Sequence, residues 1–312
     1  MNAIQTHQLT RSFGNLKAVD RLTLEVPRGT VFGFLGPNGS GKTTTIRLLL
    51  GLLEADQGDA QVLGFNTKTQ ANEIRTRCGA LLEHHGLYER LSAAGNLDYY
   101  GRIWHMSKMD REKRIRELLE PLDLYERRDE PIGRWSRGMK QKLAVARTLM
   151  HRPELIFLDE PTAGLDPVAS AALREDLTRL AVQEGVTIFL TTHNLSEAER
   201  LCNQVAVINR GQLLANGSPA ELRARTSAPR LYITGQGITS QVLEDIQKNT
   251  LVKRIQQQNG KLVVDLTDLT RSHEIIEQLV HANVSIDEVH KEKVDLEDVF
   301  LQLVDEEGRG EG

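Results

Sequence analysis

The stretch VFGFLGPNGSGKTTTIRLLL, residues 31–50, decides the fold of this chain. Its apolar run at 31–35 predicts a strand, the glycine-rich segment 36–41 a tight loop, and the residues from Lys42 onward a helix. The loop fits the pattern G-x-x-x-x-G-K-[ST], in which backbone N–H groups and the positive end of the helix dipole attract phosphate. This setting favours a nucleoside triphosphate site over an ordinary glycine-rich turn.

The residues of this loop have separate expected roles. Glycine lets the backbone curl so that successive N–H groups point inward. Lys42 is expected to reach the β- and γ-phosphates, and the hydroxyl of Thr43 to ligate Mg²⁺. Further contacts to the nucleotide are expected from Gly36, Asn38, Gly39, Ser40, Gly41 and Thr44.

The bulk composition limits the class of protein. The 312 residues allow one large or two modest domains, and the net charge of -4 supplies no overall basic field for nucleic acid. Cys78 and Cys202 cannot form a disulfide framework and suit a reducing compartment. The chain starts without a signal-peptide pattern, and no apolar run approaches the roughly 18 residues that span a bilayer. We therefore expect a cytosolic chain that reaches a membrane only through a partner.

Alternation of apolar runs with amphipathic segments predicts an α/β fold. Strands are expected at 4–9, 22–26, 60–64, 155–158, 186–191 and 205–208. Helices are expected at 42–53, 168–183 and 195–201. Residues 88–150 have mostly helical periodicity, and 57–59 read as a turn. This order is typical of a mostly parallel sheet with covering helices.

A second domain is expected after the sequence changes character at 220–229. Its strands are expected at 231–234, 251–257, 261–266 and 284–289, and its helices at 242–246 and 270–281. The order βαββαβ is typical of a ferredoxin-like α+β domain, and Asn259-Gly260 suits its tight hairpin turn. We place the domains at 1–225 and 226–304, with a last helix at 295–304 and a disordered tail at 305–312.

Two carboxylates and a histidine follow the buried strands of the first domain. Asp159 and Glu160 come at the carboxyl end of a parallel strand, where ligands bind in open α/β sheets. We expect Asp159 to hold Mg²⁺ through water and Glu160 to polarise the attacking water. His193 follows the next strand and is expected to contact the γ-phosphate and orient that water. In isolation these residues also fit a solvated acid pair and a capping histidine.

The segment WSRGMKQ, residues 135–141, fits a helix cap with a basic first turn when it is taken alone. Its place among the other motifs changes the interpretation. Five motifs occur in the order of one family, at 36–44, 136–139, 159–160, 164–166 and 192–193. Over about residues 3–222 the chain resembles the ATP-binding subunit of an ABC transporter. The resemblance implies the P-loop ABC-ATPase fold, with a RecA-like core, an antiparallel β subdomain and a helical subdomain at about 88–150.

The resemblance also implies ligands and a partner. ATP and Mg²⁺ would be bound by a head-to-tail homodimer that closes over two nucleotides. Ser136 and Gly138 would belong to the signature loop, which contacts the γ-phosphate held by the opposite subunit, and Asp166 to the loop that couples the two sites. Phe13 matches the aromatic residue that stacks on adenine, although a single aromatic residue near a strand more often belongs to the core.

Two positions depart from the family pattern. Glu83 stands where the family usually has a glutamine, in the loop that leads into the helical subdomain. A carboxylate still ligates Mg²⁺, so Glu83 is a third expected metal ligand, but its negative charge beside triphosphate is expected to alter hydrolysis or its coupling. Arg137 and Met139 replace the usual glycine and glutamine of the signature loop. Since Ser136 and Gly138 are kept, we expect activity.

The expected function is ATP hydrolysis that powers a separate integral membrane permease from the cytoplasmic face of the cell membrane, where the chain would be peripheral. The stretch 87–100 is the expected permease contact. The C-terminal part, with DLEDVFL at 295–301, is similar to the tail of drug-resistance-type exporter ATPases. That similarity favours export of drug-like, lipid-like or other small molecules, and implies dimerisation or regulation for the extra domain.

The alternative is a non-transport ABC-type ATPase that acts on ribosomes or nucleic acid. DNA-repair members carry long coiled coils between the first motif and the signature, whereas only about 90 residues intervene here. Ribosome-acting members usually have two cassettes, and this chain has one. No basic stripe is present, so no nucleic-acid partner is expected.

Overall fold

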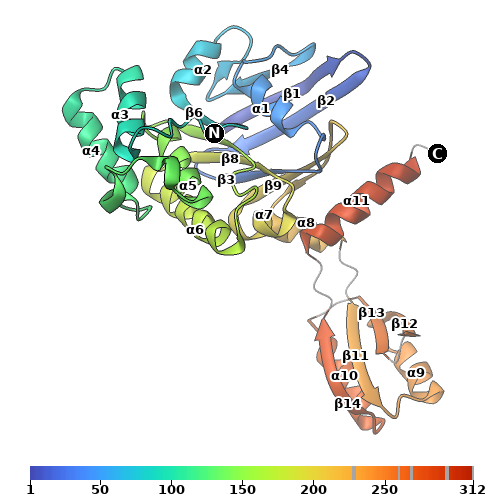
Figure 1. Cartoon of the computed structure of the whole chain (residues 1–312). Helices are drawn as coiled ribbons and strands as arrows, with labels where there is room; N and C mark the ends of the chain where they lie inside the picture. Colours follow the sequence, from blue (N-terminus) through green and yellow to red (C-terminus); the bar gives the residue numbers. More distant parts are fainter. Residues whose placement is uncertain (227–229, 259–260, 268–269, 292–294, 311–312) are drawn as a thin grey trace. The chain divides into compact units, whose positions relative to one another are not determined.

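The computed structural model describes residues 1–226, 230–258, 261–267, 270–291 and 295–310. The chain divides into two compact units (Figure 1). One comprises Met1–Pro219 with the residues from Leu303 onward, and the other comprises Ala220–Gln302. The division falls a few residues before the 225/226 boundary expected from the sequence. Among the described residues, no helix combines the length and apolar character needed to cross a bilayer.

The first unit is built on a six-stranded sheet in the order β10-β9-β3-β8-β7-β6. Its strands are β3 (Val31–Leu35), β6 (Cys78–Leu81), β7 (Leu155–Asp159), β8 (Thr187–Thr192), β9 (Gln204–Asn209) and β10 (Gln212–Gly217). All neighbouring pairs are parallel except β9 and β10, which form an antiparallel pair. The predicted parallel sheet is therefore confirmed, with β10 as an edge strand that the sequence pattern did not reveal.

A second sheet of the same unit is antiparallel, in the order β2-β1-β4-β5. Its strands are β1 (Asn2–Phe13), β2 (Leu16–Pro27), β4 (Gln57–Val62) and β5 (Phe65–Asn66). The turn expected at 57–59 lies inside β4, which pairs with β1 through a register shift between His7 and Thr10. Gly58 has a φ of 75° at this irregularity, so the turn-forming residues accommodate a bulge rather than a chain reversal.

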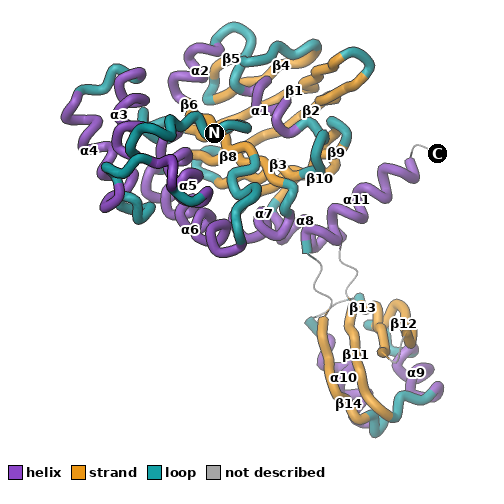
Figure 2. The backbone as a smooth tube through the Cα atoms, viewed as in Figure 1, coloured by secondary structure: helices purple, strands orange, loops and turns teal. Residues whose placement is uncertain are grey.

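Helices surround the parallel sheet. Their bounds are α1 (Lys42–Leu49), α2 (Ala71–Arg77), α3 (Ala93–Ile103), α4 (Lys108–Leu119), α5 (Arg137–Thr148), α6 (Pro167–Glu184) and α7 (Leu195–Leu201). The next helix, α8 (Pro219–Thr226), belongs to the second unit from its second residue onward. The helix expected at 42–53 ends earlier because Gly51 adopts a φ of 62°. Figure 2 shows α3 and α4 at one end of the unit and the antiparallel sheet above the parallel one, which is the expected subdivision.

The central strands β3, β7 and β8 end at one edge of the parallel sheet, where the segments with the predicted site residues follow them. Every residue of β3, β7 and β8 is buried, as expected for parallel strands covered on both faces. The rings of Phe32 and Phe157 each lie 5.6 Å from that of Phe189, so the three strands are held in register by one aromatic cluster. The carboxyl ends of β3 and β7 therefore meet β8 at Thr191 and Thr192.

The second unit has the predicted order βαββαβ. Its elements are β11 (Arg230–Gln236), α9 (Ser240–Gln247), β12 (Val252–Gln258), β13 (Lys261–Leu266), α10 (Ser272–His281) and β14 (Ser285–Lys291). The strands form an antiparallel sheet in the order β12-β13-β11-β14, which is the ferredoxin-like arrangement. The expected Asn259-Gly260 turn lies outside the described residues.

The last helix, α11 (Leu296–Gly310), is longer than the sequence suggested. The sequence predicted a helix at 295–304 and a disordered tail from Asp305, whereas the described backbone stays helical to Gly310. Glutamate has high helix propensity, so Glu306 and Glu307 continue the helix that the apolar pattern begins. The final two residues, 311 and 312, lie outside the described residues.

Candidate active site

A pocket of about 330 Å³ opens where the parallel strands end. Three segments line it: the β1–β2 hairpin with Phe13, Leu16 and Ala18, the phosphate loop with the start of α1, and the end of β7 with Asp159 and Glu160. The structure thus brings together most of the residues that the sequence predicted for nucleotide and metal.

The backbone of the phosphate loop requires glycine at two points. A Cβ atom on Gly36 would lie 2.2 Å from the carbonyl oxygen of Ile208, and one on Gly41 would lie 2.1 Å from that of Ala18. Gly41 also has a φ of 105°, which other residues rarely adopt. The hydroxyl oxygen of Ser40 is buried and has no hydrogen-bond partner in the described part of the chain. An orphaned polar atom of this kind fits a loop built to receive phosphate.

Lys42 is held inside the loop. Its Nζ atom donates to the carbonyl oxygens of Gly36 at 2.8 Å and Pro37 at 3.1 Å, and lies 3.2 Å from Oε1 of Glu160. The side chain is only 7% exposed, so burial together with these acceptors fixes the position of the ammonium group. A phosphate entering the loop would meet a cation that is already in place.

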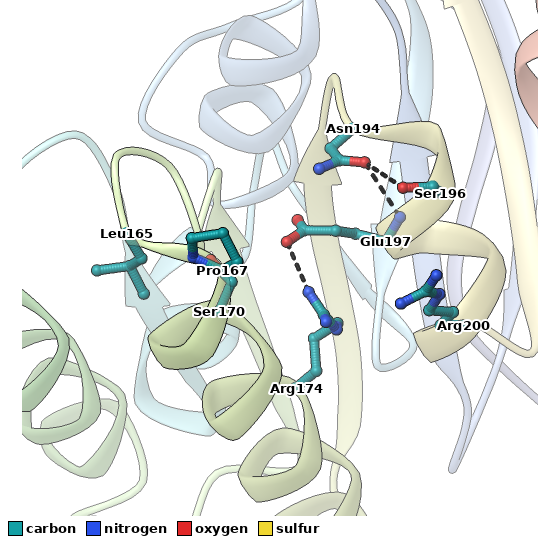
Figure 3. A pocket seen from close by; sticks show the side chains of 8 residues that line it. All are labelled: Leu165, Pro167, Ser170, Arg174, Asn194, Ser196, Glu197 and Arg200. Carbon is teal, nitrogen blue, oxygen red and sulfur yellow. Dashed lines mark hydrogen bonds and ion pairs between the residues drawn. The ribbon is translucent and has the colours of Figure 1, made fainter.

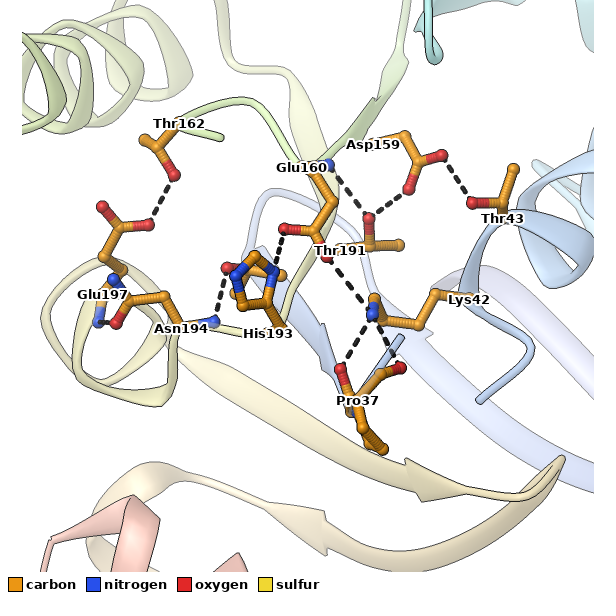
Figure 4. A network of polar contacts seen from close by, with 12 residues as sticks. Pro37, Lys42, Thr43, Asp159, Glu160, Thr162, Thr191, His193, Asn194 and Glu197 are labelled. Carbon is orange, nitrogen blue, oxygen red and sulfur yellow. Dashed lines mark hydrogen bonds and ion pairs between the residues drawn. The ribbon is translucent and has the colours of Figure 1, made fainter. Parts of the chain in front are cut away.

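Two hydroxyl groups orient the carboxylate of Asp159. The hydroxyl of Thr43 donates to Oδ2 at 2.7 Å, and that of Thr191 donates to Oδ1 (Figure 4). The oxygens of Thr43 and Asp159 are thus neighbours at the mouth of the phosphate loop. Hard oxygen ligands beside phosphate are the donor set that Mg²⁺ prefers, so these residues fit the metal that the sequence predicted.

Glu160 and His193 form the other half of the polar cluster in Figure 4. The Nδ1 atom of His193 lies 2.8 Å from Oε2 of Glu160, and the side chain of Glu160 is 23% exposed. Glu160 has a φ of 50°, an unusual value for a non-glycine residue. Its N–H group is fixed by bonds to the carbonyl and the hydroxyl of Thr191, both at 3.1 Å. Strain of this kind occurs at functional sites when the surroundings enforce it.

Five predicted nucleotide-binding residues do not line this pocket. Gly36 and Ser40 belong to the phosphate loop beside it, whereas Ser136, Gly138 and Asp166 lie at the starts of α5 and α6. Ser136 caps α5 and accepts a 3.2 Å hydrogen bond from the N–H of Met139, and Gly138 lies in the first turn of that helix. Asp166 caps α6 and accepts from the N–H groups of Val168 and Ala169 at 3.0 and 2.9 Å. In one copy of the chain the side chains of Ser136 and Asp166 therefore have local capping roles.

Glu83 lies outside the pocket, whereas Phe13 lies at its mouth. Glu83 does not line the pocket; its Oε1 atom lies 3.0 Å from the guanidinium of Arg47 in α1, and its side chain is 60% exposed. Phe13 is 47% exposed at the pocket mouth, with the guanidinium of Arg11 stacked 5.0 Å from its ring. An exposed aromatic face beside the phosphate loop fits stacking on a base.

Sequence reasoning missed two residues of this arrangement. Thr191 was included in a buried strand without a role, although a buried hydroxyl beside Asp159 needs a partner and is a signal in itself. Arg47 lies one helical turn after Thr43, but its pairing with Glu83 joins positions 36 residues apart. No local pattern reveals such a contact.

Comparison with known proteins identifies the family. A model described as ABC transporter matches residues 19–163, and one described as ATP-binding protein DrrA1-3-like, C-terminal domain, matches 217–304. The chain is 35% identical to the daunorubicin resistance ATP-binding protein DrrA3 of Streptomyces coeruleorubidus, over 98% of this chain and 97% of that protein. The chain belongs to the ABC transporter family.

Other relatives agree with this membership. The ABC subunit described here is 42% identical to the bacitracin transport ATP-binding protein BcrA of Bacillus licheniformis, over 68% of each chain. A solved structure of an ATP-binding subunit of an ABC transporter is similar with a TM-score of 0.63 and 29% identity, over 72% of this chain and 92% of that one. The predicted family, fold and ATPase activity are therefore confirmed, and the comparisons do not favour action on ribosomes or nucleic acid.

Proposed function

We propose that this ABC transporter subunit hydrolyses ATP as a head-to-tail dimer of two copies, and that hydrolysis powers an integral membrane permease that exports small molecules. The observation that carries the proposal is that the pocket and the signature loop lie apart within one copy of the chain. Lys42, Asp159 and Glu160 line one pocket and His193 contacts Glu160 beside it, whereas Ser136 lies outside the pocket. One copy thus supplies most of a reaction centre and lacks the signature loop at that centre.

Glu160 is the base of the proposed reaction. In the structure its Oε1 atom faces Lys42 and its Oε2 atom faces His193, so the ammonium of Lys42 offsets the charge of the carboxylate. Binding of ATP would place the β- and γ-phosphates against the ammonium of Lys42 and weaken its contact with Oε1 of Glu160, which would then polarise a water. His193 is 55% exposed on the other side of Glu160, where it would contact the γ-phosphate and orient the same water.

Thr43 and Asp159 would hold Mg²⁺ beside the phosphates. When bound, the ion neutralises charge that develops on the transferred group. Thr191 keeps the Asp159 carboxylate oriented toward Thr43. We propose that Glu83 joins this ligand set while Arg47 stays beside it and offsets its negative charge.

A second copy would complete each site. Ser136 is exposed at the N-terminus of the 12-residue helix α5, where free N–H groups and the helix dipole favour an anion. We propose that Ser136 and Gly138 contact the γ-phosphate held by the other copy, and that Asp166 couples the two sites. This arrangement makes hydrolysis depend on dimer formation.

The helical subdomain carries the proposed permease contact. Tyr88, Leu91, Tyr99 and Ile103 are exposed by 46, 38, 41 and 51%, and the rings of Tyr88 and Tyr99 pack edge to face at 4.9 Å. Exposed aromatic and aliphatic side chains of this kind suit a protein partner. The chain would then lie peripherally at the cytoplasmic face of the membrane. In the nucleotide site, Phe13 would stack on the adenine of ATP.

Export of drug-like or other small molecules is supported by the relatives. Two of these relatives are named for daunorubicin resistance and for bacitracin transport. The ferredoxin-like unit corresponds to the DrrA-like C-terminal family model. We propose that this unit supports dimerisation or regulation, since its described residues form a core of their own around Leu231, Ile233 and Val264.

Complementation between two inactive variants tests the shared site. Lys42→Ala disables the phosphate loop and Ser136→Glu repels phosphate at the signature loop, so each variant alone should hydrolyse ATP at a small fraction of the normal rate. A mixture forms heterodimers with one intact site, and activity should return. The rate per molecule should also rise with protein concentration. A mixture that stays inactive, or a rate per molecule that is constant down to strictly monomeric protein, contradicts the proposal.

A further inference from the structure

Two contacts join the segment after β7 to the segment after β8. The first is the contact between Glu160 and His193. The second lies two residues further along one segment and four along the other, where the hydroxyl of Thr162 donates to Oε2 of Glu197 (Figure 4). Figure 3 shows the other oxygen of Glu197 facing Arg174 of α6, with Nη1 at 2.8 Å. Both carboxylate oxygens of Glu197 are therefore engaged.

The contacts of Glu197 are shielded from solvent. Its side chain is 12% exposed and that of Arg174 is 17% exposed, at the wall of a pocket of about 280 Å³. A charge-assisted hydrogen bond that is largely buried is stronger and more rigid than an exposed one. Glu197 is thus a fixed point to which both segments and α6 are attached.

Glu197 is also tied to the residue that follows His193. The side-chain oxygen of Asn194 accepts hydrogen bonds from the N–H of Glu197 at 3.2 Å and from the hydroxyl of Ser196 at 2.9 Å. On the other segment, Pro161 accepts a 2.6 Å hydrogen bond from Gln141. The backbone on either side of the Glu160–His193 contact is therefore anchored to packed helices.

We propose that Glu197 is a positioning residue for ATP hydrolysis, which acts with Thr162 and Arg174 to keep Glu160 and His193 in register. The inference rests on the proposed roles of Glu160 and His193. When Glu160 turns to water and His193 to the γ-phosphate, their direct 2.8 Å contact is lost. The Thr162–Glu197 bond then remains to fix the spacing of the two segments. It also helps to enforce the φ of 50° at Glu160.

Removal of the Thr162 hydroxyl tests the proposal with little change in volume. Thr162→Val should lower kcat roughly 10- to 100-fold, because small misplacements of reacting groups have effects of that size. The KM for ATP should change less than about twofold because Thr162 does not line the nucleotide pocket. Thr162→Ser keeps the hydroxyl and should restore most of the rate. A Thr162→Val protein with normal kcat overturns the inference.

The partner of Glu197 on α6 provides a second variant with a matched control. Arg174→Met should lower kcat as Thr162→Val does. Arg200 lines the same pocket, and Arg200→Met removes the same charge from it while the Arg174–Glu197 pair stays intact. Arg200→Met should therefore keep kcat near normal. Equal losses in the two variants would mean that the charge of the pocket matters and not the position of Glu197.

A double-mutant cycle separates positioning from a general structural effect. In a His193→Ala background there is no histidine left to keep in register, so Thr162→Val should lower single-turnover hydrolysis by much less than it does in the native protein. The same fold-loss in both backgrounds overturns the inference. The proposed roles themselves are tested separately, because hydrolysis that survives Glu160→Gln and His193→Ala contradicts them whatever Thr162→Val does.

Discussion

The carboxylate of Glu83 lies 3.0 Å from the guanidinium of Arg47. Arg47 belongs to α1, the helix that begins with Lys42 at the end of the phosphate loop, so its charge comes from the same element as the proposed nucleotide site. The two side chains are 41% and 60% exposed, and a pair of this kind contributes little to folding stability. Its consequence is local, because Arg47 offsets the negative charge that Glu83 places where the family usually has glutamine.

Arg47 is therefore expected to affect the KM for Mg-ATP only while residue 83 is a glutamate. Arg47→Ala should raise the KM for Mg-ATP by roughly two- to fivefold at low salt, the range of an exposed charge interaction. In a Glu83→Gln background the same substitution should have almost no effect. Steady-state hydrolysis of the four proteins at low and high ionic strength measures this coupling. An equal effect of Arg47→Ala in both backgrounds would show that Arg47 acts independently of Glu83.

Thr191 is expected to control the affinity for Mg²⁺ without touching the ion. Its hydroxyl orients Asp159, and loss of such a supporting hydrogen bond typically costs 10- to 100-fold in metal affinity. Thr191→Val should thus raise the Mg²⁺ concentration needed for half-maximal hydrolysis by about tenfold. Thr187 lies at the opposite end of β8, where its hydroxyl accepts from Gly29, so Thr187→Val is the control. Matching Mg²⁺ titrations for the two variants would contradict the role of Thr191.

The local parts of the fold were predictable because each rests on a local pattern. The loop 36–41, the buried strands and the order βαββαβ follow from glycine spacing and hydrophobic periodicity, and the ends of parallel strands must meet at one edge. The same patterns predicted that Asp159, Glu160 and His193 lie at one edge of the sheet, where Glu160 and His193 are in contact.

Contacts between distant segments were not predictable in the same way. The pairing of Glu83 with Arg47 and the attachment of Thr162 to Glu197 depend on how separate segments pack, which one sequence does not encode in any short window. The turn expected at 57–59 failed for a related reason. Pairing with β1 overrides the turn preference of Gly58 and makes these residues a bulged strand.

Arg114 is expected to hold the helical subdomain against the core. It lies on α4, is 1% exposed, and donates to both oxygens of Glu184 in α6 at 2.9 and 2.7 Å and to the carbonyl of Leu149 at 2.7 Å. Arg114→Ala leaves these acceptors without their donor, so it should lower the free energy of unfolding by roughly 3 kcal/mol. Thermal unfolding measures the effect as a lower Tm.

A matched control lies on the same helix. Arg116 is 61% exposed and pairs with Glu120, so Arg116→Ala should change the free energy of unfolding by less than about 0.5 kcal/mol. Arg114→Lys keeps the charge but cannot donate to both oxygens of Glu184, and an intermediate Tm is expected. If the alanine variants at 114 and 116 unfold at the same temperature, the buried pair does not hold the subdomain in place.

His151 is expected to make stability depend on pH. Its Nε2 atom lies 3.1 Å from the carbonyl oxygen of Cys78, and its ring stacks on that of Trp104 with centroids 4.0 Å apart. Burial, helped by the positive charges of Arg114 and Arg147, lowers the pKa of His151 from 6.5 to about 4, and the hydrogen bond to the Cys78 carbonyl only partly opposes this shift. Between these two pH values the unfolded chain binds a proton that the folded chain does not, so stability present above pH 6.5 is lost as the pH falls toward 4.

Replacement of the histidine should flatten this dependence. His151→Gln keeps a side-chain donor for the Cys78 carbonyl but does not titrate, so its Tm should fall less than that of the native protein between pH 7 and pH 5. The exposed His7 provides the control, and His7→Gln should follow the native pH profile. Thermal unfolding at several pH values compares the three proteins. If His151→Gln loses as much stability on acidification as the native chain, other groups carry the pH dependence, and the buried neutral imidazole is not its source.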